Sequence, residues 1–221
     1  MADPIADWQA EHLNFGRLFA LLQKQIDVFH TGKRPNYELM LDVVSYLRDY
    51  ADQFHHPREE VAFKFLAKHC PDLVLALDRL TQEHRVIAHA GEALRLLLQA
   101  IISGAIIPRA EAVRLTPPLV SRAKATISAK RSASPGEASI DGAIIPRAEV
   151  EMAAATYLVY YSNHIAREEE EEDILGRTVQ ALTKEEWEDV KTAVPTVDDP
   201  LSPGSAEKRY RELRRQIALE A

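Results

Sequence analysis

Four histidines occupy equivalent heights in the apolar stripes of four segments, and this pattern constrains the fold more than any other feature. Apolar residues in each segment recur every three or four positions, which is typical of one face of an α-helix. Each histidine is 18 or 19 residues from the end of its segment that lies at one common end of the bundle, after the first and third segments and before the second and fourth, a distance of about 27 Å along a helix. In an antiparallel arrangement all four would meet at one level of the core. They are His12, His55, His84 and His164.

The same periodicity predicts an all-α fold, an up-down-up-down four-helix bundle with short connections. The four helices are expected at about 4–30, 36–68, 71–102 and 146–175. Pro57 lies inside the second helix and predicts a kink or a local irregularity near the histidines. In the tail, Thr183 and Glu186 form a capping-box pattern that opens a short helix. A second short amphipathic helix is expected around Tyr210.

An eight-residue repeat marks an insertion between the third and fourth helices. The sequence GAIIPRAE occurs at 104–111 and again at 142–149. Deleting either 104–141 or 112–149 leaves the same chain, so an insertion that duplicated its target is the simplest interpretation. The inserted residues are rich in Ala, Ser and Pro, which favours a flexible surface loop over a docking arm for an acidic partner. The predicted domains are the bundle, with 112–149 as its inserted loop, and a helical extension packed on it, at 1–176 and 177–221.

Composition and charge argue against several classes of protein. The net charge is −7, whereas nucleic-acid binding needs a basic face. No window offers the roughly 18 consecutive apolar residues of a membrane span, and the first residues lack the pattern of a signal peptide. The single cysteine, Cys70, cannot form an internal disulfide. We therefore expect a cytoplasmic protein with neither nucleic acid nor membrane as partner.

Two of the four histidines are followed by a glutamate one helical turn later. His55–Glu59 and His164–Glu168 both read His-x-x-x-Glu, and residues four apart lie on the same helix face. Such a carboxylate can bridge two metal ions while its histidine binds one of them. Imidazole and carboxylate donors suit iron, with manganese or zinc possible, and without a cation their burial would be costly. The predicted metal ligands are His12, His55, Glu59, His84, His164 and Glu168.

A second His-x-x-x-Glu pair overlaps the first one. His56 and Glu60 have mostly polar helical neighbours, whereas the neighbours of His55 and Glu59 are mostly apolar. The apolar stripe therefore favours His55 and Glu59 and leaves His56 and Glu60 as alternative or additional ligands.

Three further residues lie one or two helical turns from the predicted ligands. His89 is five residues after His84, which turns it about 140° around the helix and disfavours a ligand role without excluding one. Tyr161 and Tyr157 precede His164 by one and two turns. Both are expected to pack in the core, where a hydroxyl group could hydrogen-bond a bound ligand.

These residues resemble the hemerythrin-like family, also called the HHE cation-binding domain. The resemblance rests on His12 in the first helix, FHHPREEVAF in the second, EHR in the third and HIAREEEE in the fourth. The tail, with LTKEEWEDV, DDPLSPG and RYRELRRQI, is similar to that of many bacterial members. The resemblance covers nearly the whole chain apart from the insertion. It implies a four-helix bundle around a non-haem centre of two iron ions joined by an oxo bridge.

The chain departs from hemerythrins proper at two positions. Those proteins have a fifth histidine where this chain has Ala88, and a more distant aspartate where it has Glu168. The chain is more similar to four-histidine, two-glutamate relatives, which include iron-sensing and nitrosative-stress repair proteins. The resemblance implies binding or sensing of oxygen or nitric oxide at the site that Ala88 leaves open. Iron handling for repair, and an enzyme that turns over peroxide or reduces nitric oxide, are the alternatives.

Overall fold

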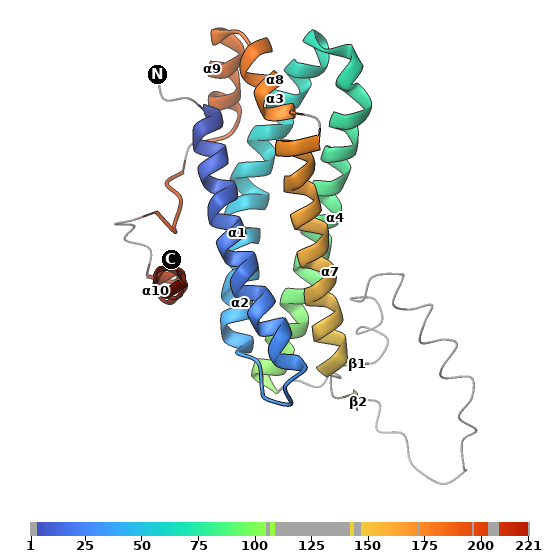
Figure 1. The fold of residues 1–221 in the computed structure, drawn as a ribbon, viewed down its shortest axis with the longest axis vertical. Coiled ribbons are helices and arrows are strands. Elements are labelled where there is room, and N and C mark those ends of the chain that lie inside the picture. The colour runs from blue at the N-terminus through green and yellow to red at the C-terminus, as the bar shows by residue number, and fades with distance from the viewer. Residues whose placement is uncertain are drawn as a thin grey trace, which may run out of the picture.

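Four antiparallel rods of helix lie side by side and form the bundle of the computed structural model (Figure 1). The structure describes residues 4–104, 107–108, 142–143, 147–171, 173–195, 197–202 and 208–220. The first and third rods are α1 (Pro4–Phe29) and α4 (Val74–Ser103), the latter preceded by the short 3-10 helix η2 (Pro71–Leu73). The second rod is α2 (Tyr37–Tyr46), η1 (Leu47–His55) and α3 (His56–His69). The fourth is α7 (Arg147–Ala166) followed by η3 (Arg167–Glu171). The all-α bundle predicted from the apolar periodicity is confirmed.

The second rod contains nine residues of π-helix, η1, which end at His55. The backbone N–H of His56 donates to the carbonyl of Ala51, five residues earlier. Pro57 follows directly, and proline supplies no N–H for the carbonyl four residues before it. A wider π turn accommodates this loss, and such turns often occur at functional sites. The irregularity predicted near the histidines is therefore present, and it changes the register of α3 relative to α2.

The fourth rod ends earlier than the periodicity predicted. The helix was expected to continue to about 175, but it passes into the π-helix η3, and Asp173 then takes a left-handed conformation with φ of 47°. Gly176 permits this sharp turn, because a Cβ atom there would collide with the Asp173 carboxylate. Leu175 consequently belongs to a separate helix, α8 (Ile174–Ala181).

The described part of the tail forms three short helices instead of the expected two. After α8 come α9 (Lys184–Ala193) and α10 (Arg211–Glu220). The capping box predicted for α9 is present, with Thr183 accepting from the N–H of Glu186 and returning its own N–H to the Glu186 side chain. Helices α8 and α9 pack on α3, and α10 packs on α1 and α2. The described helices of the tail thus lie against the bundle.

Two apolar clusters fill the bundle and are separated by a buried polar layer. The larger cluster lies toward the turn between α1 and α2 and includes Phe15, Leu94 and Tyr161. The smaller cluster lies toward α8 and α9 and includes Trp8 and Phe63. Burial of these side chains is the main stabilising contribution to such a bundle. The predicted histidines lie between the two clusters.

The described residues near the insertion are few. Strand β1 (Ile107–Pro108) pairs antiparallel with β2 (Gly142–Ala143), and one strand comes from each copy of the repeat. The remainder of the predicted loop lies outside the described residues, so neither the expected flexible loop nor the alternative docking arm is tested.

Helix α4, with η2 before it, forms a long and apolar stretch. Within the part of the chain that the structure describes, Pro71–Ser103 is one stretch long and apolar enough to cross a bilayer by length and composition alone. In the bundle, 44% of its most apolar window is buried, and the helix carries His84 into the core. Its apolar residues therefore serve as a core face. The expected cytoplasmic location remains a prediction.

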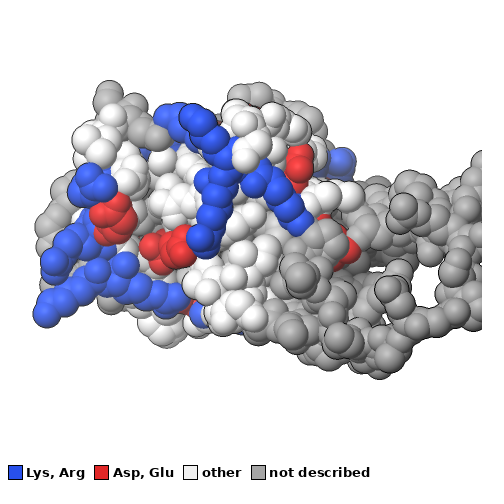
Figure 2. Space-filling view, turned by 90° about the horizontal axis from the view of Figure 1, so that it is seen from below, with Lys and Arg blue, Asp and Glu red and all other residues white. Residues whose placement is uncertain are grey.

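Charged side chains are unevenly distributed over the surface. Seen from the turn end of the bundle, Lys and Arg outnumber Asp and Glu on the described surface (Figure 2), although the whole chain has a net charge of −7. This end is about 27 Å from the histidines by helix rise, well beyond the screening length of about 8 Å at physiological salt. Basic groups there have little electrostatic influence on the buried layer.

Candidate metal centre

Five histidines and two glutamates converge in the buried layer between the two apolar clusters. The histidines come from all four rods, and both glutamates are fully buried. Their exposed fractions are 4% for His12, 1% for His55, 3% for His56, 4% for His84, 1% for His164 and 0% for Glu59 and Glu168. All six residues predicted as ligands from the sequence lie in this layer, together with His56.

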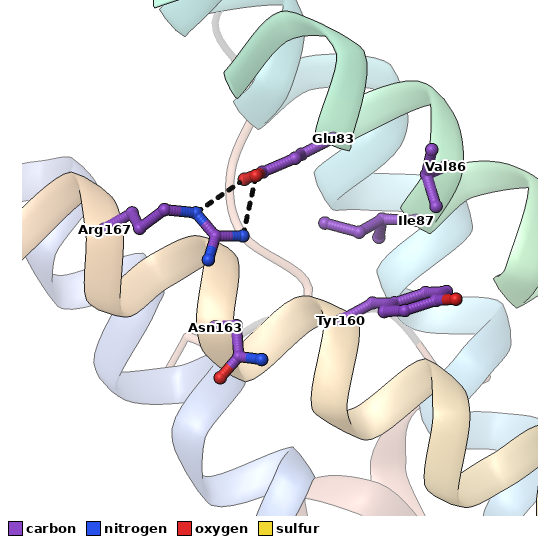
Figure 3. Close-up of a pocket in the computed structure, with 6 residues that line it drawn as sticks. All are labelled: Glu83, Val86, Ile87, Tyr160, Asn163 and Arg167. Carbon is purple, nitrogen blue, oxygen red and sulfur yellow. Dashed lines mark hydrogen bonds and ion pairs between the residues drawn. The ribbon is translucent and has the colours of Figure 1, made fainter. Parts of the chain in front are cut away.

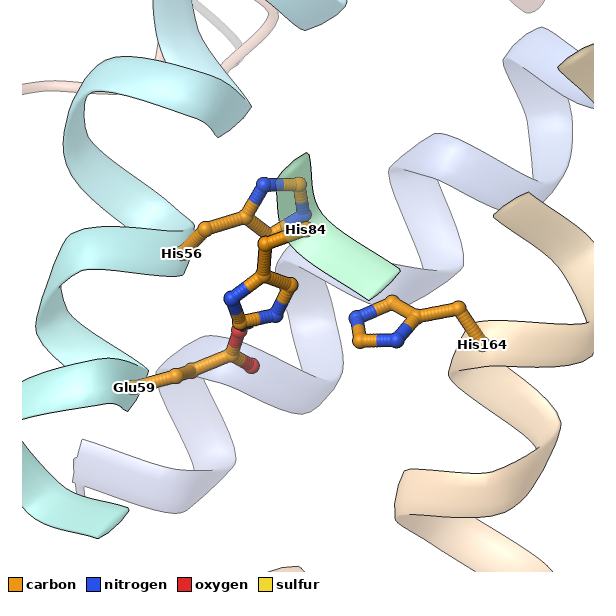
Figure 4. A group of neighbouring side chains, drawn as sticks. All are labelled: His56, Glu59, His84 and His164. Atoms are coloured by element: carbon orange, nitrogen blue, oxygen red, sulfur yellow. Dashed lines mark ion pairs between the residues drawn. The ribbon is translucent and has the colours of Figure 1, made fainter. Parts of the chain in front are cut away.

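The inward-facing atoms form two groups that could each hold a metal ion. The first consists of His12, His55 and Glu59, and the second of His56, Glu59, His84 and His164; the donor atoms of each group lie within 4.8 Å of one another. We call them the two-histidine group and the three-histidine group. Figure 4 shows the three-histidine group, with His56 and Glu59 on α3, His84 on α4 and His164 on α7.

Each of the two glutamates faces both groups. Glu59 directs Oε1 to His55 Nε2 at 3.0 Å and Oε2 to His84 Nε2 at 3.5 Å. Glu168 directs Oε2 to His12 Nε2 at 3.6 Å and Oε1 to His164 Nε2 at 3.3 Å. Both carboxylates are therefore placed to bridge two ions.

The hydrogen-bonding state of these atoms tests whether the site fits a cation. Both oxygens of Glu59 and of Glu168, and the Nε2 atoms of His84 and His164, are buried without a hydrogen-bond partner. Buried polar atoms in proteins are almost always partnered, because leaving one unpaired costs about 1–3 kcal/mol. Six such atoms pointing at one another are explained by cations between them. Nitrogen and oxygen donors of this kind suit iron, manganese or zinc, so the residues fit the group that the sequence implied.

The outer nitrogen of every histidine faces a carboxylate. Four of the five pairs are hydrogen-bonded, whereas the His56 pair lies 3.3 Å apart without hydrogen-bond alignment. An acceptor at Nδ1 leaves Nε2 free to bind a metal, which is the usual arrangement of metal-ligating histidines. The pairs are His12 with Glu169 (2.8 Å), His55 with Glu11, His56 with Asp52, His84 with Glu60 (3.2 Å) and His164 with Glu83 (3.2 Å).

Electrostatics of the metal-free layer follow from these contacts. Burial lowers the pKa of His12, but the hydrogen bond to Glu169 and the nearby carboxylates of Glu59 and Glu168 outweigh burial and raise that pKa to about 10. The same balance raises the pKa of His84 well above its ordinary value. Protons on the imidazoles thus compensate the buried carboxylates in place of metal ions. They must leave when a metal binds.

The structure places both His55 and His56 in the layer. The sequence favoured His55 and left His56 as an alternative or additional ligand; both are buried, and each lies in a different group. The π-helix explains why: the apolar-stripe argument assumed uniform α-helical steps through this rod, and η1 breaks that register. The ring of His56 stacks on that of His84 with centroids 4.2 Å apart and an interplanar angle of 10°.

Two alternative ligands do not join either group. Glu60 is half-buried, and its Oε1 faces Nδ1 of His84 from the outer side. His89 is exposed, because five helical steps from His84 turn it toward solvent. Ala88, one turn after His84, is half-buried on α4.

The two tyrosines of α7 differ in their distance from the metal layer. The hydroxyl of Tyr161 lies 3.1 Å from His56 Nε2, so this side chain contacts the centre directly. Tyr157 is buried next to Tyr161, on the side away from the metal layer, and the two ring centroids are 5.8 Å apart. Gly91 allows this packing, since a Cβ atom there would lie 3.0 Å from the Tyr157 ring.

Sequence reasoning missed the outer carboxylates. Two of these carboxylates could have been found from the sequence, because Glu11 is adjacent to His12 and Glu83 is adjacent to His84. Yet Glu11 pairs with His55 and Glu83 with His164, on different rods. Adjacency in sequence could identify the carboxylates but not the histidines that they serve.

A cavity of about 300 Å³ lies between α4 and α7 beside the three-histidine group. Figure 3 shows that Glu83 and Arg167 form an ion pair at one end of it. Glu83 also faces Nδ1 of His164, so the cavity borders the metal layer through an outer carboxylate. Its lining consists of Glu83, Val86, Ile87, Tyr160, Asn163 and Arg167.

The fold and the site together define a four-helix bundle with a buried histidine–carboxylate metal centre. The family model of the hemerythrin HHE cation binding domain matches residues 3–172, and the chain belongs to this family. Its function accordingly includes the binding of metal cations, typically iron. Searches among curated proteins and among solved structures gave no significant match.

Proposed function

We propose that this protein is a non-haem di-iron protein that binds or senses oxygen or nitric oxide at the metal centre in the bundle core. The observation that carries the proposal is the placement of Glu59 and Glu168, each with one oxygen toward each histidine group. A single ion would not need two carboxylates that each face both histidine groups. When bound, two iron ions would supply a redox-active pair able to bind a diatomic gas.

The unequal number of histidines in the two groups favours one side of the centre for the gas. The three-histidine group offers three imidazoles beside the shared carboxylates, whereas the two-histidine group offers His12 and His55. An ion with fewer protein ligands retains more room for an exogenous one. The two-histidine group, rather than the position beside Ala88, is therefore the proposed ligand side.

The surroundings of the two-histidine group suit a small neutral ligand. The ring of Phe15 lies 5.0 Å from that of His55 and 6.0 Å from that of His12, and the ring of Trp8 lies 6.5 Å from that of His55. Both aromatic side chains are buried. They exclude water from this side, which disfavours charged ligands more than oxygen or nitric oxide.

The test is anaerobic loading with ferrous iron, metal analysis, and absorption spectra before and after exposure to each gas. We expect two irons per chain and the absorption of an oxo-bridged iron pair after oxygen, with changes on reduction and on exposure to nitric oxide. Two bound irons with a spectrum that neither gas changes would contradict the proposed function.

Iron handling for repair under oxidative or nitrosative stress is the second candidate. It is favoured by Glu169, the outer partner of His12, whose 35% exposed side chain places a solvent-exposed carboxylate beside one ligand of the two-histidine group. Loss of iron to a weak chelator without unfolding would support this candidate. Peroxide turnover or nitric-oxide reduction well above that of free iron would instead identify an enzyme.

A further inference from the structure

The carboxylate of Glu11 is the meeting point of three donors from the second rod. Nδ1 of His55 donates to Oε2. The Tyr50 hydroxyl donates to Oε1 at 2.7 Å, and Nη2 of Arg58 lies 2.8 Å from both oxygens. Arg58 is itself held by a bond from Nε to the carbonyl of Phe54 at 3.0 Å. The position of the Glu11 carboxylate is therefore fixed from three directions.

Glu11 differs from the other outer carboxylates in burial. Its side chain is 9% exposed, compared with 15% for Asp52, 19% for Glu83, 31% for Glu60 and 35% for Glu169. Buried, charge-assisted hydrogen bonds hold their partners more firmly than exposed ones. Among the five pairs, the one between Glu11 and His55 is thus the most rigidly built.

This pair determines which nitrogen of His55 can bind a metal. An ionised carboxylate only accepts hydrogen bonds, and the ion pair with Arg58 keeps Glu11 ionised. The proton of a neutral His55 ring must then reside on Nδ1. That leaves the lone pair of Nε2 directed at Glu59 and His12, in the centre of the two-histidine group.

We propose that Glu11 is the positioning residue of the two-histidine group, where it fixes the tautomer and ring orientation of His55 and thereby sets the affinity for one of the two ions. The proposal rests on the two-ion centre of the proposed function. Since His55 is one of only two histidines in its group, an error in its orientation has a larger consequence there than in the three-histidine group.

The experiment compares Glu11→Gln with wild type, using zinc as a redox-inert and diamagnetic probe. Glutamine keeps the shape of the side chain and can still accept from Tyr50 and Arg58, but its amide can donate to Nδ1 of His55 and favour the wrong tautomer. Stepwise zinc affinities are measured by competition with a chromophoric chelator, and histidine tautomers by nitrogen-15 NMR of the zinc-loaded protein.

We expect wild type to bind two zinc ions and Glu11→Gln to bind one of them about 10- to 100-fold more weakly, the usual effect of losing an outer carboxylate. The NMR spectrum of the variant should show His55 partly in the Nδ1-unprotonated form. The matched control, Glu60→Gln, changes the partly exposed partner of His84 and should weaken zinc binding less. Tyr50→Phe, which removes one donor to Glu11 and keeps the carboxylate, should weaken the same ion as Glu11→Gln, by a smaller factor.

Three results would overturn the proposal. Unchanged affinities and tautomers in Glu11→Gln would show that the carboxylate does not position His55. Equal weakening of both ions, with a lower melting temperature of the metal-free protein, would show a general structural role. A wild type that binds a single zinc would refute the two-ion centre itself, which separates failure of the premise from failure of the role given to Glu11.

Discussion

The two His-x-x-x-Glu segments have the same spacing in sequence but contribute differently to the centre. In the second rod, the π-helix η1 ends at His55, and both His55 and the following His56 face inward. In the fourth rod, the π-helix η3 begins after the histidine and contains Glu168, and Ile165 rather than a second histidine follows His164. The first segment thus places one imidazole in each group, whereas the second supplies one imidazole to the three-histidine group and a carboxylate that faces both groups. The spacing is the same, but the residue after the first histidine and the position of the π turn differ.

Two histidines, one from each group, differ in charge when no metal is present. The pKa of His12 is raised to about 10, because the carboxylates around it outweigh burial. The pKa of His56 is lowered well below its ordinary value, because burial and the nearby charge of His84 both oppose its protonation. His12 is therefore charged at neutral pH, whereas His56 is neutral and ready to bind a metal.

The largest effect is expected from changing the two glutamates that both histidine groups share. Because Glu59 and Glu168 each face both groups, Glu59→Ala and Glu168→Ala should each abolish the two-ion centre. Metal analysis should show at most one ion per chain. The variants should also lose the stabilisation by metal, which for wild type is about 2.7 kcal/mol at a free metal concentration 100 times the Kd.

The control for this pair is Glu188→Ala, which changes an exposed glutamate of α9. It should bind metal and melt like wild type. If Glu59→Ala or Glu168→Ala retained two ions with an unchanged spectrum, the bridging role assigned to these carboxylates would be wrong.

A smaller effect, which differs between the two, is expected when the neighbouring histidines of the second rod are changed one at a time. His55→Ala leaves one imidazole in its group, and we expect that group to lose its ion at metal concentrations that saturate wild type, with a drop in affinity of at least about 100-fold. His56→Ala leaves two imidazoles in the other group, so two ions should remain with an altered spectrum. Metal titration of both variants measures the difference. Equal losses would show that the groups are not distinct.

The contrast between His55 and His56 also shows how far sequence reasoning reaches here. Helix rise and apolar spacing predicted a common level for four histidines, and the structure places all six predicted ligands at that level. Their metal binding stays a prediction. His56 was given only as an alternative or additional ligand because uniform α-helical steps were assumed, whereas the wide turn before Pro57 depends on a missing N–H group. Apolar periodicity carries no information about such a turn.

The outer carboxylates and the end of the fourth rod show the same limit. Glu11 lies beside His12 in sequence but pairs with His55, a choice made by the packing of α1 against the second rod. The fourth rod was extended to 175 on periodicity, but Asp173 and Gly176 turn the chain into α8. Both features depend on tertiary contacts, which spacing along one helix cannot reveal.

The difference in charge between His12 and His56 predicts opposite effects of pH on the metal-free protein. A raised pKa stabilises the fold below the ordinary value of 6.5 and loses this contribution as pH rises to about 10. A lowered histidine pKa, as for His56, stabilises above 6.5 and loses its contribution as pH falls. The free energy of unfolding should therefore be highest near pH 6.5.

Urea unfolding of metal-free protein across this range measures the effect, with metal-loaded protein as the comparison. Loaded protein should not show the decline between pH 6.5 and 10, because bound metal replaces the protons. His12→Gln should reduce the decline above pH 6.5, to which His84 also contributes through its raised pKa, and His56→Gln should reduce the decline below it. If His12→Gln instead changed the decline below pH 6.5, or His56→Gln the decline above it, the two charge states would be assigned the wrong way round.

The smallest effect is expected far from both groups. Deleting 112–149 restores a single copy of GAIIPRAE before Val150 and keeps the register of the fourth rod, since the two copies are identical. The junction is about 27 Å from the metal layer by helix rise, so metal content and absorption spectrum should match those of wild type. A deletion of 112–150 is the matched control, because removing one more residue rotates the junction by one helical step. If deleting 112–149 alone removed the centre, the insertion would have to contribute to the site, and the depth assigned to His164 from the turn would be wrong.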